Sequence, residues 1–148
     1  MKSASFMDSA FAEAESASQR GEVPIGAVAV LAGQIVARAG NRTRELNDPT
    51  AHAEILVIRE ACSKLSSERV PQVDLYVTLE PCPRCAAAIS FARIRRLYFG
   101  ASDEKGGAVT NGITYFSQPT CHHSPDIYPG IGEVQSVRLL RQFFQQKR

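Results

Sequence analysis

The chain has 148 residues, the length of one ordinary domain, and its 44% hydrophobic and 22% charged residues are typical of a globular protein with a buried core. This composition excludes a disordered tail, a collagen-like fibre and a coiled-coil rod, and no apolar run approaches the roughly 20 residues that span a bilayer. The net charge of +2 is too small by itself to indicate a nucleic-acid partner, although the basic excess lies in the second half. The acids Asp8, Glu13 and Glu15 are foreign to a secretory signal, so we expect a cytoplasmic protein.

The first part of the sequence predicts a helix followed by a hairpin. Apolar residues recur at helical spacing over residues 7–18, and Gly21 is a suitable end for that helix. Residues 25–31 have the pattern of a buried strand. A tight turn at residues 32–34 then returns the chain as a second strand over residues 35–39.

A polar loop over residues 41–50 precedes a second helix. Apolar residues recur at helical spacing over residues 55–65, and either Asp48 or Thr50 is expected to cap this helix. A run of apolar and β-branched residues then predicts a strand over residues 73–79.

The second half continues the alternation of helix and strand. Pro81 is expected to open a helix, and residues 97–99 form a short strand that ends at Gly100. Residues 101–132 show few patterns typical of a helix or a strand. A last helix is predicted over residues 133–146, with one apolar face made of Val134, Val137, Leu140 and Phe144. This order predicts the α/β class, a mixed sheet with helices on its faces, but not the strand order.

Two short polar motifs stand at the starts of predicted helices. They are His52-Ala53-Glu54 and Pro81-Cys82-Pro83-Arg84-Cys85. The 30 residues from His52 to Cys82 suffice for one helix, a return loop and a strand. Both helix starts are therefore expected to meet at the same end of the sheet.

This meeting favours a catalytic zinc site. One imidazole and two thiolates, from His52, Cys82 and Cys85, are ligands that Zn²⁺ takes, and helix N-termini favour the thiolate form. Three protein ligands leave one position for water, as catalytic sites do. Glu54, two residues from His52, is placed to take a proton from that water, whose pKa zinc lowers to about 7 from about 15.7.

The cysteine pair has two other interpretations. A thioredoxin-like redox pair needs neither His52 nor Glu54, so the joint pattern favours the catalytic metal. A structural zinc module that binds nucleic acid without chemistry is the alternative from another class. Such a site requires a fourth protein ligand and has no use for Glu54.

The motifs resemble the signature of the cytidine and adenosine deaminase superfamily, in which a glutamate that is not a ligand serves as acid and base. The chain is similar, over nearly its whole length, to bacterial tRNA-specific adenosine deaminases of the TadA type. The matching stretches are Glu22-Val23-Pro24-Ile25-Gly26-Ala27-Val28, Asn41-Arg42, Asp48-Pro49-Thr50-Ala51-His52-Ala53-Glu54, Leu75-Tyr76-Val77-Thr78-Leu79-Glu80-Pro81-Cys82, Lys105-x-Gly107-Ala108 and Phe143-Phe144.

The resemblance implies a three-layer α/β/α cytidine-deaminase-like fold with a mixed central sheet of about five strands, built as one zinc-dependent deaminase domain over residues 1–148. It implies a homodimer that holds one Zn²⁺ per subunit through His52, Cys82 and Cys85, with Glu54 as the catalytic residue. The implied reaction is hydrolysis of the wobble adenosine of a tRNA anticodon stem-loop to inosine.

The resemblance also implies which residues contact the substrate. Asn41 is expected to hydrogen-bond the purine edge, and Asp103 to contact a neighbouring ribose. His123 would help to shape the anticodon pocket, and the basic end of the last helix would contact tRNA. The full expected set is Asn41, Ala53, Asp103, His123 and Phe144.

One rival function stays open at this point. A free-base or nucleoside deaminase that acts on guanine, cytosine or cytidine shares the zinc chemistry but needs no basic tail. Phe143 and Phe144, with the basic residues around them, either stack on bases and bind phosphate or form an amphipathic helix with a solvated basic face.

Two further features also have two interpretations. The run Cys121-His122-His123 either supplies another metal ligand or packs as a loop near the active site with one histidine bonded to backbone. We favour the packed loop, because adjacent residues seldom aim at one metal. Arg84, where the resembled family usually has Met, either binds an RNA phosphate or faces solvent, and the surface habit of arginine favours solvent.

Overall fold

The computed structural model describes residues 2–146, with side chains described from Phe6 onward. The basic residues Lys147 and Arg148, expected to contact tRNA, lie outside these residues. None of the helices in the described part is long and apolar enough to cross a membrane. In chain order the elements are α1 (Lys2–Gln19), β1 (Gly26–Leu31), β2 (Gln34–Gly40), α2 (Ala53–Leu65), β3 (Val73–Leu79), α3 (Pro83–Ala92), β4 (Arg96–Ala101), the 3₁₀ turn η1 (Tyr115–Ser117), β5 (Asp126–Tyr128) and α4 (Glu133–Gln146).

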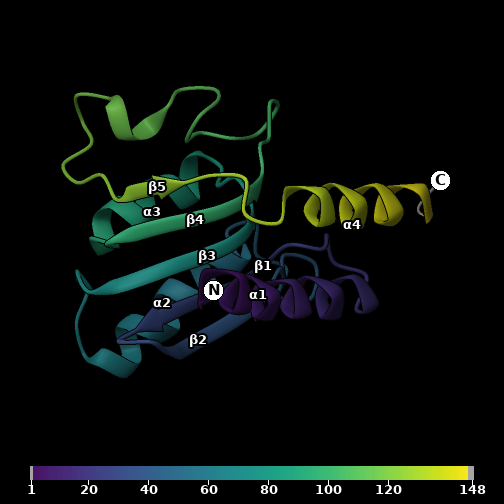
Figure 1. Cartoon of the computed structure of the whole chain (residues 1–148), viewed down its shortest axis with the longest axis horizontal. Helices are drawn as coiled ribbons and strands as arrows, with labels where there is room; N and C mark the ends of the chain where they lie inside the picture. The colour runs from purple at the N-terminus through teal and green to yellow at the C-terminus, as the bar shows by residue number, and fades with distance from the viewer. Residues whose placement is uncertain (1, 147–148) are drawn as a thin grey trace.

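The five strands form one mixed sheet in the order β2-β1-β3-β4-β5 (Figure 1). The hairpin makes β1 antiparallel to β2, and β1 is also antiparallel to β3. From β3 to β5 the strands are parallel, because α3 carries the chain back between β3 and β4 and the long segment 102–125 carries it back between β4 and β5. The predicted α/β class and the mixed sheet of about five strands are confirmed.

Helices lie on both faces of this sheet. Residues of α2 and α3 join the larger apolar cluster with β1, β3 and β4, whereas α1 builds a second cluster on the opposite face. A Cβ on Gly26 would lie 2.1 Å from the Ala10 carbonyl oxygen, so α1 rests directly on β1. On the α1 side, α4 extends beyond the ends of the strands (Figure 1). This overhang leaves much of α4 exposed.

The sequence did not predict β5. This strand has only three residues, and Pro125 and Pro129 flank it, so it has too few positions for an alternating pattern. It exists because it pairs with β4. A second difference is that α3 begins at Pro83 rather than Pro81, with Cys82 as its N-cap.

Val137, Leu140 and Phe144 share one face of α4 as predicted, but this face lines a surface pocket and is not the buried face. Val134 is 73% exposed and Phe144 is 50% exposed, whereas Ser136 and Phe143 are buried. The cause is a close approach to the sheet: a Cβ on Gly100 would lie 3.2 Å from the Ser136 Cβ. Only a small side chain fits there, so the helix turns its serine inward.

Candidate active site

His52 and Cys82 occupy equivalent places, because each is the N-cap residue of its helix, α2 and α3 respectively. Both have extended backbone angles, and Cys85 follows in the first turn of α3. The two helices pack against each other on the same face of the sheet. The predicted meeting of the two motifs at one end of the sheet is therefore confirmed.

The three side chains are spaced as zinc ligands. The His52 Nδ1 atom lies 3.6 Å from the Cys82 Sγ and 3.5 Å from the Cys85 Sγ. Tetrahedral zinc with ordinary Zn–N and Zn–S lengths separates such atoms by about 3.6 Å. Within the described residues, these three form the one group of histidine, cysteine and acidic side chains with metal-ligand spacing.

Glu54 lies two residues after His52, and its side chain is buried. The residue is 4% exposed, and its buried Oε1 has no hydrogen-bond partner among residues 2–146. Burial raises the pKa of this carboxyl above its ordinary value, and the neighbouring His52 opposes that rise. A buried oxygen without a partner is costly unless a ligand supplies one, so the site fits a metal with a bound water.

The pKa values of the two thiols are shifted in opposite directions. A hydrogen bond from Cys85, together with His52, outweighs burial and lowers the pKa of Cys82 to about 3. The same contact and burial raise the pKa of Cys85. The protein alone therefore stabilises one thiolate at this point.

Asn41, at the end of β2, caps the helix that begins the motif. Its Oδ1 accepts a hydrogen bond of 2.9 Å from the backbone N–H of Ala53, and both residues are buried. The predicted caps are wrong: Asp48 Oδ1 instead accepts from the backbone and hydroxyl of Thr50, and neither caps α2. A residue that is distant in sequence took the role because β2 ends beside this helix.

Arg84 is exposed, as the sequence favoured, but it also touches the site. Its Nη2 lies 2.9 Å from the His52 Nε2, on the side of the ring opposite the sulfur atoms. The guanidinium therefore covers the outer edge of the imidazole.

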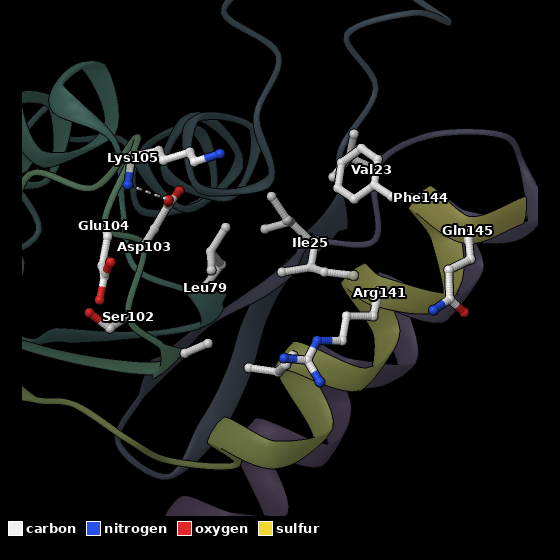
Figure 2. Close-up of a pocket in the computed structure, with 13 residues that line it drawn as sticks. Val23, Ile25, Leu79, Ser102, Asp103, Glu104, Lys105, Arg141, Phe144 and Gln145 are labelled. Atoms are coloured by element: carbon white, nitrogen blue, oxygen red, sulfur yellow. Dashed lines mark hydrogen bonds between the residues drawn. The ribbon is translucent and has the colours of Figure 1, made fainter. Parts of the chain in front are cut away.

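A pocket of about 710 Å³ opens between α4 and the loop after β4 (Figure 2). Asp103 and Lys105 lie on the loop side, Arg141 and Phe144 on the helix side, and Leu79 with other apolar residues between them. His52, Cys82 and Cys85 are not in its lining. Leu79 is three residues before Cys82, however, so the Cα atoms of these two residues are at most about 11 Å apart.

Glu80, to which no sequence pattern gave a role of its own, organises this loop. Glu80 is 2% exposed and accepts hydrogen bonds from loop residues 102–111. Burial alone would raise the pKa of its carboxyl, but donors led by the Asp103 and Val109 N–H groups lower it to about 2. The sequence feature that could have indicated this role is an acidic residue placed between a predicted buried strand and the Pro81-Cys82 motif.

The histidine run does not join the metal-ligand group. His123 Nε2 lies 2.7 Å from the Ile94 carbonyl oxygen, just beyond the C-terminal end of α3, whereas the cysteines lie at the N-terminal end. The expected histidine-to-backbone bond is confirmed. The part of His123 in shaping an anticodon pocket stays a prediction, and this position is at the opposite end of the helix.

Comparisons with known proteins find deaminases. A family model described as MafB19-like deaminase matches residues 1–148. The chain is 68% identical over 143 residues to a tRNA-specific adenosine deaminase of Agrobacterium fabrum. The alignment covers 97% of this chain and 94% of the relative. A solved structure from a study of tRNA:A34 deaminases that edit A to I at the wobble position has a TM-score of 0.91 and 67% identity, over 92% of this chain and 99% of that one. A guanine deaminase of Bacillus subtilis has a TM-score of 0.66 and 28% identity, over 93% and 92% of the two chains.

Proposed function

This chain belongs to the family of tRNA-specific adenosine deaminases, and we propose that it hydrolyses the wobble adenosine of a tRNA anticodon loop to inosine. The observation that carries this function is the buried Glu54 carboxyl beside the His52, Cys82 and Cys85 group, in a chain 68% identical to such an enzyme. The free-base alternative is not favoured, since the guanine deaminase shares only 28% identity. Inosine at the wobble position of tRNA after incubation with the protein is the direct test.

We propose that His52, Cys82 and Cys85 hold one zinc ion per subunit. Their donor types and their spacing of 3.5–3.6 Å support this choice. When bound, zinc supplies an acidified water for attack on the base. A cobalt-substituted sample whose spectrum shows an exchangeable water would support a catalytic site, whereas a closed site would support the structural zinc module.

Glu54 is proposed as the residue that moves protons. In the reaction one water adds to C6 of adenine and one ammonia leaves, so two protons must reach nitrogen atoms. Glu54 takes one proton of the attacking water and gives it to N1. It then takes the proton of the new C6 hydroxyl and gives it to the 6-amino group, which leaves as ammonia while the C6 carbonyl forms. Its raised pKa, caused by burial, suits a group that must both accept and return a proton.

We propose that the substrate contacts expected from the sequence lie in two places. Asn41 and Ala53 are bonded to each other beside Glu54, where Asn41 would meet the purine edge. Asp103 and Phe144 line the pocket next to that site, together with Arg141. A free base needs only the first place, so a second, partly basic pocket supports an extended RNA substrate. The anticodon loop offers unpaired bases for both.

The remaining expectations concern assembly and location. One sheet with a cluster on each face supports a single domain over the matched residues 1–148. Phe91 on α3 is 66% exposed and Ile113 is 51% exposed, and a homodimer would cover such apolar side chains. Light scattering of the purified protein, with Phe91→Ser for comparison, tests the dimer. The cytoplasmic location stays a prediction.

A further inference from the structure

The buried carboxylate of Glu80 holds the loop that forms one wall of the pocket. Its Oε2 accepts from three successive backbone N–H groups, those of Val109, Thr110 and Asn111, at 2.9–3.1 Å. Its Oε1 accepts from the backbone N–H of Asp103 at 3.0 Å and from the Asn111 side chain at 2.7 Å. The Glu80 carboxylate, directly after the end of β3, therefore holds both ends of the loop 103–111.

The loop is shaped to receive this carboxylate. A Cβ on Gly107 would lie 2.5 Å from both the Glu80 Oε2 and the Asp103 carbonyl oxygen, so the Gly107 position has no room for a side chain. The Ala108 N–H also donates to the Pro81 carbonyl oxygen at 2.9 Å. The loop thus packs against the segment that leads into Cys82, and its position is set relative to the metal ligands.

Asp103 is fixed on both sides by this arrangement. Its own N–H is bonded to Glu80, and its Oδ1 accepts from the N–H of Gly106 at 3.0 Å. The same Oδ1 accepts from the N–H of Lys105 at 3.2 Å (Figure 2). Its Oδ2 makes no hydrogen bond to the residues that the structure describes. That oxygen is available to a hydroxyl donor such as a ribose in the pocket.

We propose that Glu80 is a positioning residue for RNA binding, which acts by holding Asp103 in the pocket wall and does not itself touch RNA. This inference rests on the proposed function for the identity of the ligand. Its basis is the hydrogen-bond geometry, since an acceptor with two oxygens is needed to satisfy the two groups of donors.

The variant Glu80→Gln tests the geometry. The amide oxygen of glutamine can still accept from residues 109–111, but its NH₂ group then faces the Asp103 N–H, which loses its acceptor. We expect the Kd for an anticodon stem-loop, measured by fluorescence anisotropy, and the KM for tRNA to rise about tenfold. Zinc content should be unchanged, and kcat should stay within about twofold.

A double-mutant cycle with Asp103→Ala separates positioning from general damage. If Glu80 acts through Asp103, the Glu80→Gln effect on Kd disappears in the Asp103→Ala background. Glu22→Gln is the matched control, because Glu22 is also 2% exposed and accepts the backbone N–H groups of Arg44 and Glu45. Its effect should be unchanged by Asp103→Ala.

The inference is overturned if folded Glu80→Gln binds RNA like the original chain, or if its full effect persists without the Asp103 carboxylate. Should Glu80→Gln not fold, Asn111→Ala removes one donor and should raise Kd in the same direction by a smaller factor, and an unchanged Kd would overturn the inference. Binding of the stem-loop without deamination would refute the proposed function but leave this inference to be decided by the same cycle.

Discussion

The Oδ1 atom of Asn41 lies 2.9 Å from the backbone nitrogen of Ala53, so one side chain both caps α2 and holds the residue that precedes Glu54. The contact joins the end of β2 to the helix that carries Glu54. A side chain in this place has two separable parts: the oxygen accepts the helix N–H, and the NH₂ group is the part that we propose meets the substrate.

Substitutions of Asn41 should separate these parts. Asn41→Asp keeps an oxygen for the Ala53 N–H, so the free energy of unfolding should change little while deamination falls sharply. Asn41→Ala removes the cap as well and should cost about 1 kcal/mol of stability. Thermal unfolding and deamination rates of the two variants check this. Full activity of the aspartate variant would refute the predicted contact with the purine edge.

Removing the Glu54 carboxylate should stop the reaction without releasing the metal. We expect Glu54→Ala to lower kcat by at least about a thousandfold, because proton transfer to and from the base is lost. Zinc content by elemental analysis should stay at one per subunit, since Glu54 is not one of the three ligands. The assigned role fails if activity is retained.

The two adjacent phenylalanines of α4 should behave differently. Phe144 is 50% exposed at the pocket, so Phe144→Ala should raise the KM for tRNA about tenfold, as expected for a lost base-stacking contact, with little change in stability. Phe143 is 4% exposed, and Phe143→Ala should lower the free energy of unfolding by about 3 kcal/mol.

Deletion of residues 141–148 is a less specific test, because it also removes the buried Phe143. The shortened protein should lose its rate of tRNA deamination. If it folds and deaminates a free base as fast as the full chain does, that result would contradict the tRNA assignment.

The packing of α1 on β1 predicts a large effect at one glycine. Gly26→Ala places a Cβ 2.1 Å from the Ala10 carbonyl oxygen and 2.5 Å from the Ala14 nitrogen. The helix must shift, and we expect a loss of about 3 kcal/mol of stability. Gly21→Ala is the control: no atom lies within 4 Å of its Cβ, and its φ of +86° should cost only about 1 kcal/mol. Equal melting temperatures for both variants would contradict this account.

The parts of this structure that sequence could predict are those with local patterns. His52, Cys82 and Cys85 were recognisable because their residue types and the 30-residue gap place two helix starts at one end of a sheet. In contrast, β5 is held by its neighbour β4, and its three residues carry no pattern of their own.

The contacts of Asn41 and Glu80 were not predictable for a different reason. Asn41 caps Ala53 across 12 residues, and Glu80 bonds residues 22–31 positions away, so neither partner is visible in a local window. The inward face of α4 was set by the room above Gly100, a packing effect that overrides the apolar stripe.

The most direct test of the central claim is a comparison of substrates with the zinc-loaded protein. A tRNA with adenosine at the wobble position would be supplied in parallel with free adenosine, cytidine, cytosine and guanine, with Glu54→Ala as the blank. We predict inosine at the wobble position and no turnover of the free bases and nucleosides. Deamination of a free base or nucleoside with untouched tRNA would contradict the proposed substrate while leaving the zinc chemistry in place.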